Sequence, residues 1–249
     1  MKIPLKSAAE LESMRTSCRM AAEVRDRVGE AVQAGVTTGE LDALARRLIE
    51  GMKAKPSFLG YRGYPAAICI SVNDEVIHGI PGRRVVLPGD VVSLDVGVYY
   101  KGFHGDTATT VMVGVTDPDV IRLVETTRRA LDAAIAAAKP GGSLYDVSHA
   151  VESVVKASGC SVVREFVGHG VGRHLHEDPQ VPNYGVPGRG PALKPGMTLA
   201  IEPMVNLGRA EVSVLDDKWT VVTRDGRPSA HFEHTVAVLG EGVEVLTLA

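Results

Sequence analysis

The stretch LDVGVYYKGFHGDTATTV, residues 94–111, decides the fold of this chain, because it holds a complete β-hairpin with one carboxylate in each arm. Lys101-Gly102 is typical of a hairpin turn, and alternating apolar and polar residues place Asp95 on the face opposite its apolar neighbours. A hairpin centred between Tyr100 and Lys101 makes Asp95 and Asp106 direct cross-strand partners, about 4.5–5.5 Å apart at Cβ. We therefore expect two carboxylates to share one face of an antiparallel sheet.

Two carboxylates this close cannot both ionise cheaply, so a positive group should lie between them. The alternative is that one aspartate caps a turn while the other faces solvent. The position of Asp95 between Leu94 and Val96, in an otherwise apolar strand, argues against that alternative.

Two glutamates, Glu202 in MTLAIEPMV (197–205) and Glu233 in AHFEHTVAV (230–238), also lie inside apolar, strand-like runs. Unpaired buried glutamates are rare because losing their hydration is costly, and a shared cation accounts for all four carboxylates. Four carboxylates overload one ion, whereas bridging carboxylates hold pairs of metals about 3.5–4 Å apart. Oxygen ligands with one or two imidazoles suit divalent Mn, Fe or Co, with Zn also possible. Such a pair generates hydroxide from bound water at neutral pH, which indicates a hydrolase.

An internal repeat connects these carboxylates. The turns at Gly35 and Gly141, 106 residues apart, each precede a predicted helix. LPGDV (87–91) and KPGMT (194–198) each precede a predicted strand, and their glycines are 107 residues apart. Asp95 and Glu202, in the strands that follow, are also 107 residues apart. The repeat predicts a pseudo-symmetric fold. A single catalytic domain, residues 1–249, then consists of two halves, at about 1–115 and 116–249, with a polar site between them.

Four helices are predicted from their N-terminal caps, and runs rich in β-branched residues predict the strands. The caps are Ser7, Thr37, Asp117 and Ser143. The strand-like runs are 66–72, 91–98, 107–114, 161–166, 197–203, 210–215, 219–223 and 231–239. Helix pairs followed by runs of strands favour an α+β fold over a parallel βαβ sheet.

Composition and charge exclude several classes of protein. Of the 249 residues, 45% are hydrophobic and 23% are charged, as in an ordinary globular enzyme. A net charge of −3 gives no support to nucleic-acid binding by bulk electrostatics. The three cysteines are too few and too scattered for a disulfide framework or a thiolate zinc site. Because no apolar leader or membrane-spanning run is visible, we expect a soluble, cytoplasmic protein.

VGHGVGRHLHEDPQ, residues 167–180, contains three histidines within eight residues, namely His169, His174 and His176. Histidine is a frequent metal ligand and proton carrier, which marks this stretch as part of a site. Its glycines lack the G-x-G-x-x-G spacing and the strand-loop-helix context of a phosphate-binding loop, so nucleotide binding is excluded. The stretch alone does not divide the three histidines between metal and substrate.

In their order and contexts, five residues resemble the metal-ligand set of the methionine aminopeptidases, namely Asp95, Asp106, His169, Glu202 and Glu233. The strings SVNDEVIHGIP, DVGVYYKGFHGDTATT, GHGVGRHLHEDP, LAIEPM and FEHT are similar to the short type I form of that family, and the resemblance covers nearly the whole chain. It implies the pita-bread fold, with two pseudo-symmetric halves around a curved antiparallel β-sheet. It also implies that the chain removes the initiator methionine from new polypeptides.

The resemblance further implies a role for each ligand. Two divalent metal ions (Co, Mn, Fe or Zn) are held by Asp95, Asp106 and Glu233, with Asp106 and Glu233 bridging. His169 and Glu202 complete the second metal, and Glu202 accepts a proton from the attacking water. The metal bound in the cell does not follow from the residues, since affinity order and supply decide it.

Two histidines outside this ligand set are implied to contact the substrate. His78, in VIHGIP, resembles the residue that contacts the scissile nitrogen, and His176 resembles the one that polarises the substrate carbonyl. His174 matches no site residue, and Arg173 is expected to make structural or rim contacts. The other histidines beside ligands are expected at most to support them, namely His104, His231 and His234.

By the same resemblance, an apolar pocket receives the methionine side chain. Its lining, besides His78 and His176, is Phe58, Tyr61, Tyr64, Cys69, Leu175 and Trp219. Aromatic walls suit a thioether. This chain departs from the family at two positions, because many relatives have cysteine in place of Phe58 and phenylalanine in place of Leu175. Both residues keep the pocket apolar, and Cys69 is expected to be a wall because the metals supply the nucleophile.

Two alternatives share the fold. A Xaa-Pro aminopeptidase or prolidase uses the same five ligands, but such relatives usually carry a further N-terminal domain. A non-catalytic pita-bread protein, acting as a binding or chaperone module, would have lost ligands that this chain keeps. The expected partners are nascent polypeptide N-termini with methionine followed by a small residue. We also expect a monomeric chain, with neither a membrane nor nucleic acid as partner. The sequence leaves open whether the chain associates with the ribosome, where these substrates emerge.

Overall fold

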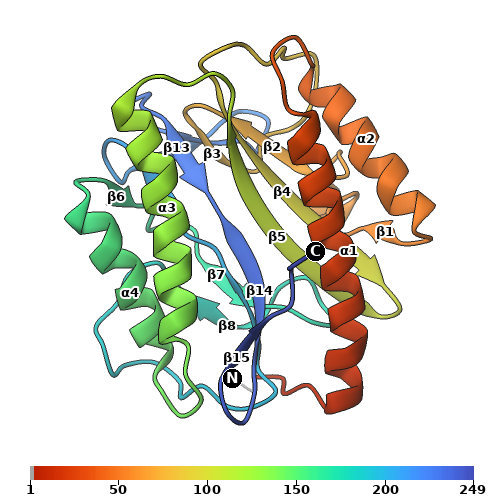
Figure 1. Ribbon diagram of the computed structural model, residues 1–249, viewed down its shortest axis with the longest axis vertical. Coiled ribbons are helices and arrows are strands. Elements are labelled where there is room, and N and C mark those ends of the chain that lie inside the picture. Colours follow the sequence, from red (N-terminus) through yellow and green to blue (C-terminus); the bar gives the residue numbers. More distant parts are fainter. Residues whose placement is uncertain (1–2) are drawn as a thin grey trace.

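The computed structural model describes residues 3–249, which form helices packed on a curved antiparallel sheet (Figure 1). The long helices are α1 (Ala8–Ala31), α2 (Thr38–Gly51), α3 (Pro118–Ala137) and α4 (Leu144–Ala157). Each begins after the N-cap that the sequence predicted, namely Ser7, Thr37, Asp117 and Ser143. Within residues 3–249 no helix has the length and apolar character needed to cross a membrane.

The main sheet follows the path β1-β4-β5-β14-β9-β7-β8, with β2 beside β4 and β15 beside β14. Its strands are β1 (Lys55–Pro56), β2 (Cys69–Val72), β4 (Val91–Tyr100), β5 (Phe103–Met112), β7 (Gly168–Gly170), β8 (Glu177–Val181), β9 (Thr198–Ile201), β14 (Glu233–Val238) and β15 (Val243–Val245). Two small sheets have the orders β13-β10-β6 and β11-β12-β3. They consist of β3 (Glu75–Ile77), β6 (Ser161–Val162), β10 (Met204–Asn206), β11 (Val212–Val214), β12 (Val221–Thr223) and β13 (Ser229–His231).

Every run predicted to be a strand contains one, but the lengths differ. The run 161–166 contributes only the two residues of β6, and β5 begins at Phe103, earlier than predicted. The strands β7 and β8, which flank the loop of the histidine stretch, were not predicted, because β7 is three residues long with two glycines and β8 is mostly polar, so neither shows the alternation of apolar and polar residues.

The hairpin of β4 and β5 forms, but in a different register from the one predicted. Lys101-Gly102 is itself the turn, so Gly97 pairs with Asp106 and Asp95 pairs with Ala108. The predicted direct pairing of Asp95 with Asp106 is therefore wrong, and the two carboxylates are diagonal neighbours on one face. Both turn residues adopt positive φ, 46° and 93°, as a two-residue turn of this kind requires, and this moves the centre of the hairpin by one residue.

Both helix pairs cover the same face of the main sheet. Leu94 and Val96 of β4 pack in one core with α1 and α2, while Leu199 and Ile201 of β9 pack in another with α3 and α4. The strand register places these apolar side chains on a single face. Since side chains alternate along a strand, the intervening residues point to the opposite face, which is the one that carries the carboxylates.

The two halves make equivalent contacts around their helix caps. Thr37 forms an isolated antiparallel bridge with Val85, and Ser143 forms one with Ala192. Thr37 and Ser143 are 106 residues apart, and Val85 and Ala192 are 107 residues apart, which are the two offsets found in the sequence. Matched contacts of this kind are what pseudo-symmetric halves require.

Candidate metal centre and substrate pocket

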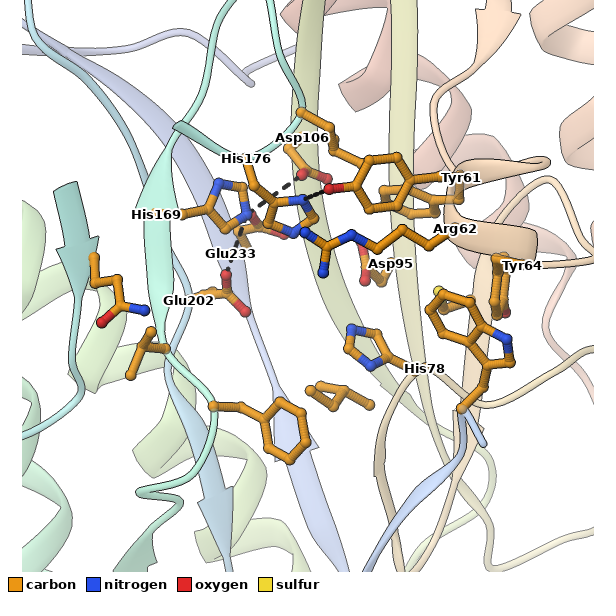
Figure 2. A pocket seen from close by; sticks show the side chains of 18 of the residues that line it. Tyr61, Arg62, Tyr64, His78, Asp95, Asp106, His169, His176, Glu202 and Glu233 are labelled. Atoms are coloured by element: carbon orange, nitrogen blue, oxygen red, sulfur yellow. Dashed lines mark hydrogen bonds and ion pairs between the residues drawn. The ribbon is translucent and has the colours of Figure 1, made fainter. Parts of the chain in front are cut away.

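Five neighbouring strands of the main sheet each direct one potential metal ligand to the same face. In the sheet order β4, β5, β14, β9 and β7, these ligands are Asp95, Asp106, Glu233, Glu202 and His169. Register explains the alignment, since strand partners share a face and Asp95 and Glu233 both pair with Ala108. Glu202 directly follows β9 and continues its alternation. Figure 2 shows the five side chains converging on one space.

The atoms of this group lie close enough to bind a common cation. Asp106, His169 and Glu233 each offer one ligand atom, and the three atoms lie within 4.8 Å of one another. Nε2 of His169 lies 3.5 Å from Oε1 of Glu202 and 3.9 Å from Oδ2 of Asp106. The other ring nitrogen, Nδ1, makes a 2.9 Å hydrogen bond with the carbonyl of Gly170. Nδ1 therefore carries the proton, and the lone pair of Nε2 faces the carboxylates.

The electrostatics of the cluster favour a bound cation. Burial raises the pKa of all four carboxyls, and neighbouring carboxylates add to the shift at Asp95, Glu202 and Glu233. Within residues 3–249, Oδ1 of Asp95 and Oδ1 of Asp106 are buried without a hydrogen-bond partner. Burial lowers the pKa of His169 to about 3, so its ring is neutral and able to ligate. Unpaired buried acceptors beside a neutral imidazole fit a divalent metal ion.

Threonine hydroxyls hold the backbone of two ligand strands. Oγ1 of Thr235 donates to the carbonyl of Asp106 at 2.7 Å, and Oγ1 of Thr107 donates to the carbonyl of Glu233 at 2.8 Å. Nη1 of the buried Arg25 donates in turn to Oγ1 of Thr107 at 2.7 Å. Sequence reasoning missed these residues, although Thr107 directly follows Asp106 and Thr235 comes two positions after Glu233.

A cavity of about 370 Å³ lies against the potential metal ligands, and all of the residues predicted for the site line it. Its apolar wall is formed by Phe58, Tyr61, Tyr64, Cys69, Leu175 and Trp219. Its further lining was missed by sequence reasoning and comprises Arg62, Ile77, Glu165, Phe166, Val167 and Gln180. Arg62 and Ile77 directly adjoin predicted residues, and Val167 and Gln180 lie within the histidine stretch 167–180, which are the sequence signals that could have indicated them.

The two histidines expected to contact substrate stand on different sides of this cavity. His176 makes a 2.8 Å hydrogen bond between Nδ1 and the hydroxyl of Tyr61, and its ring centroid lies 4.2 Å from that of His169 (Figure 2). His78 has a φ of 59°, rare for a residue with a side chain. Burial, with a smaller contribution from His176, lowers the pKa of His78 to about 4. The hydroxyl of Tyr64 donates to the carbonyl of Gly79, the residue after His78, at 2.8 Å, and so fixes this turn.

The remaining predicted histidines and Arg173 lie outside the ligand group. His174 is exposed and does not line the cavity, and Arg173 makes ion-pair and stacking contacts on the surface. Nε2 of His231 lies 3.6 Å from Oε2 of Glu202. His104 makes a 2.8 Å hydrogen bond with the hydroxyl of Ser57, and His234 makes one of the same length with the hydroxyl of Thr247.

Comparisons with known proteins agree with this site. Residues 12–239 match the model of Metallopeptidase family M24. Methionine aminopeptidase 1 of Bacillus subtilis is 49% identical to this chain over 97% of the chain and 98% of the relative's length. The chain belongs to metallopeptidase family M24, among the methionine aminopeptidases. The methionine aminopeptidase of Escherichia coli is 44% identical over all of this chain and 95% of its own length.

Solved structures confirm the predicted α+β pita-bread fold of this family member. The crystal structure of methionine aminopeptidase from Thermotoga maritima matches with a TM-score of 0.98 and 46% identity, covering 100% of both chains. A prolidase from Pyrococcus furiosus matches with a TM-score of 0.79, over 98% of this chain and 65% of that one, but at 23% identity it shows the fold alone. Membership of a metallopeptidase family implies bound divalent metal, for which Asp106, His169 and Glu233 are placed.

Proposed function

We propose that this chain removes methionine from the N-terminus of polypeptides by hydrolysing the first peptide bond. One observation carries the proposal, namely that five adjacent strands direct four carboxylates and an imidazole against an aromatic-walled cavity. The names of relatives that are 49% and 44% identical to this chain support methionine as the residue removed. The apolar wall suits a thioether side chain, since sulfur packs favourably against aromatic rings.

The ligand roles form part of the proposal. Asp95, Asp106 and Glu233 would hold two divalent ions, with Asp106 and Glu233 shared between them, and His169 and Glu202 would complete the set of the second. The ions are Co, Mn, Fe or Zn, which this mixture of oxygen and nitrogen ligands accepts. When bound, the two ions supply a water of lowered pKa as the nucleophile.

The protein's own side chains manage the protons and the substrate. Glu202 takes a proton from the attacking water, since its carboxylate lies among the proposed metal ligands, with Oε1 3.5 Å from Nε2 of His169. When the hydroxyl of Tyr61 donates to Nδ1 of His176, the proton on Nε2 is left to donate to the substrate carbonyl oxygen. His78 is neutral at pH 7 and hydrogen-bonds the scissile nitrogen.

The remaining elements of the proposal concern the whole chain. Its natural substrates are nascent polypeptides with a small second residue, and residues 1–249 act as one catalytic domain with halves at about 1–115 and 116–249. A cytoplasmic location and the monomeric state stay predictions, and association with the ribosome stays an open question.

Turnover of a Met-Ala-Ser peptide, measured with added Mn²⁺, Co²⁺ or Fe²⁺, tests the proposal. We expect release of free methionine, and we expect Asp106→Asn to abolish it while the variant stays folded. A parallel assay with a Xaa-Pro peptide tests the prolidase alternative. Absence of methionine release with every metal would overturn the proposal.

A further inference from the structure

The loop between β7 and β8, residues 171–176, decides where His176 stands. Gly170 of β7 pairs with Glu177 of β8, so the loop leaves and rejoins the main sheet at adjacent positions. Its last two residues, Leu175 and His176, line the cavity. The position of the His176 ring therefore depends on what holds this loop.

Glu177 closes the loop and is itself held by a buried ion pair. Its Oε1 accepts a hydrogen bond from the backbone N–H of His174 at 3.1 Å. Its Oε2 contacts the ammonium of Lys6, and both side chains are only 5% exposed. Removing one partner of a buried ion pair leaves an uncompensated charge, so the orientation of the Glu177 carboxylate depends on Lys6.

Two contacts besides the ion pair with Glu177 fix the position of Lys6. Its backbone N–H donates to the carbonyl of Gly196 at 2.7 Å, in the turn before β9. Gly172 of the loop leaves room for the lysine side chain, because a Cβ at Gly172 would collide with Cε of Lys6. The segment before α1 therefore runs between the turn and the loop.

A second ion pair touches the same loop but is solvent-exposed. Arg173 contacts Glu10 at 3.0 Å, and its side chain is 62% exposed. Exposed pairs of this kind contribute little to stability. The buried pair is therefore the contact that can fix the loop.

We propose that Lys6 and Glu177 are positioning residues for His176. Their ion pair holds the loop so that the His176 ring lies 2.8 Å from the hydroxyl of Tyr61 and against the ring of His169. The proposal rests on the proposed peptidase function, because it acts through the role of His176 at the substrate carbonyl.

Lys6→Met tests this directly, since methionine keeps an unbranched stem but lacks the ammonium. The Glu177 carboxylate then loses its partner, and the loop is free to shift. We expect kcat for Met-Ala-Ser to fall about 10- to 100-fold, because displacing a positioned group by about 1 Å can cost 10²-fold. Metal content should not change, since Lys6 touches none of the proposed metal ligands. Lys6→Arg, which keeps the charge, should recover part of the loss.

A double-mutant cycle separates positioning from general support of the fold. In a His176→Ala background, Lys6→Met should cost no further kcat, while thermal stability falls as much as in the wild-type background. Arg15→Met is the matched control. It breaks the 2.7 Å ion pair with Glu244, which lies away from the loop, and should leave kcat unchanged.

Each outcome decides the matter. Wild-type kcat in Lys6→Met, or an equal loss of kcat in both backgrounds, overturns the positioning role. If Lys6→Met does not fold, Glu177→Gln replaces it in the cycle, because its amide oxygen still accepts from His174. A loss confined to the background that retains His176 is then expected, and no loss overturns the role. Inactive wild-type protein would instead contradict the proposed function.

Discussion

Adding Mn²⁺ to the metal-free protein at neutral pH should displace protons from the buried carboxyl cluster. Burial raises the pKa of Asp95, Glu202 and Glu233, so the metal-free cluster retains protons that a bound cation must expel. His169 contributes none at this pH, because burial lowers its pKa to about 3 and its ring is already neutral.

The sign and size of the pH dependence follow from this competition. Below the raised pKa of a carboxyl the metal competes with a proton, and above it the competition ends, so metal affinity should rise with pH and then level off. Each displaced proton tightens the Kd about ten-fold per pH unit, or about 1.4 kcal/mol. Two displaced protons would tighten it about a hundred-fold per pH unit over the same range.

Isothermal titration calorimetry in two buffers of different ionisation enthalpy measures both quantities, the Kd and the number of protons released. Asp95→Asn is the matched control, because it removes one titrating carboxyl while keeping its shape, and it should lower the number of protons released. A Kd that does not change between about pH 6 and 8, with no proton release, would refute the reasoning.

Three further predictions address the histidines, the pocket and the core. His174→Ala should leave turnover of Met-Ala-Ser within a few-fold, whereas His176→Ala should lower it about 10²–10⁴-fold; equal losses would contradict this division. Gly97→Ala places a Cβ 2.6 Å from the Phe58 ring. It should raise KM for methionine peptides and lower the free energy of unfolding by about 1–3 kcal/mol, and an unchanged KM would argue against Phe58 as a pocket wall. Leu123→Ala, in the α3 core and fully buried, should lower the free energy of unfolding by about 2–5 kcal/mol. Urea denaturation measures this loss, and an unchanged midpoint would contradict it.

Local signals in the sequence predicted the helices well and the strand register less well. A cap such as Ser7 acts within one turn, so its outcome does not depend on distant residues. The predicted partner of Asp95 was wrong by two residues, because the turn centre lies one residue further along the chain, and the position of that centre, not the alternation of side chains, decides which residues pair. The strand β7 was missed because its glycines serve close packing. A Cβ at Gly168 or Gly170 would collide with a carbonyl of the adjacent strand.

The site divides in the same way between local and distant information. Carboxylates within apolar strands, such as Asp95 and Glu233, can be recognised as site candidates from the sequence, because a buried charge needs a partner. Contacts between residues far apart in the chain produce no local sequence pattern from which they could be predicted. The pair of Lys6 and Glu177 joins positions 171 residues apart, and Arg62 enters the cavity only because the fold places the 3₁₀ turn Tyr61–Gly63 there.

The place of β14 in the sheet has a consequence for how this protein is made. β14 is almost the last strand in the chain, yet it lies between β5 and β9 at the centre of the sheet. Until it inserts, both of those strands present open edges, and pairings over such long sequence separations form slowly. Glu233, the potential ligand that β14 carries, completes the cluster at the same moment. A metal that binds only the closed sheet would then stabilise the finished molecule over every partly built one, in proportion to the logarithm of its free concentration.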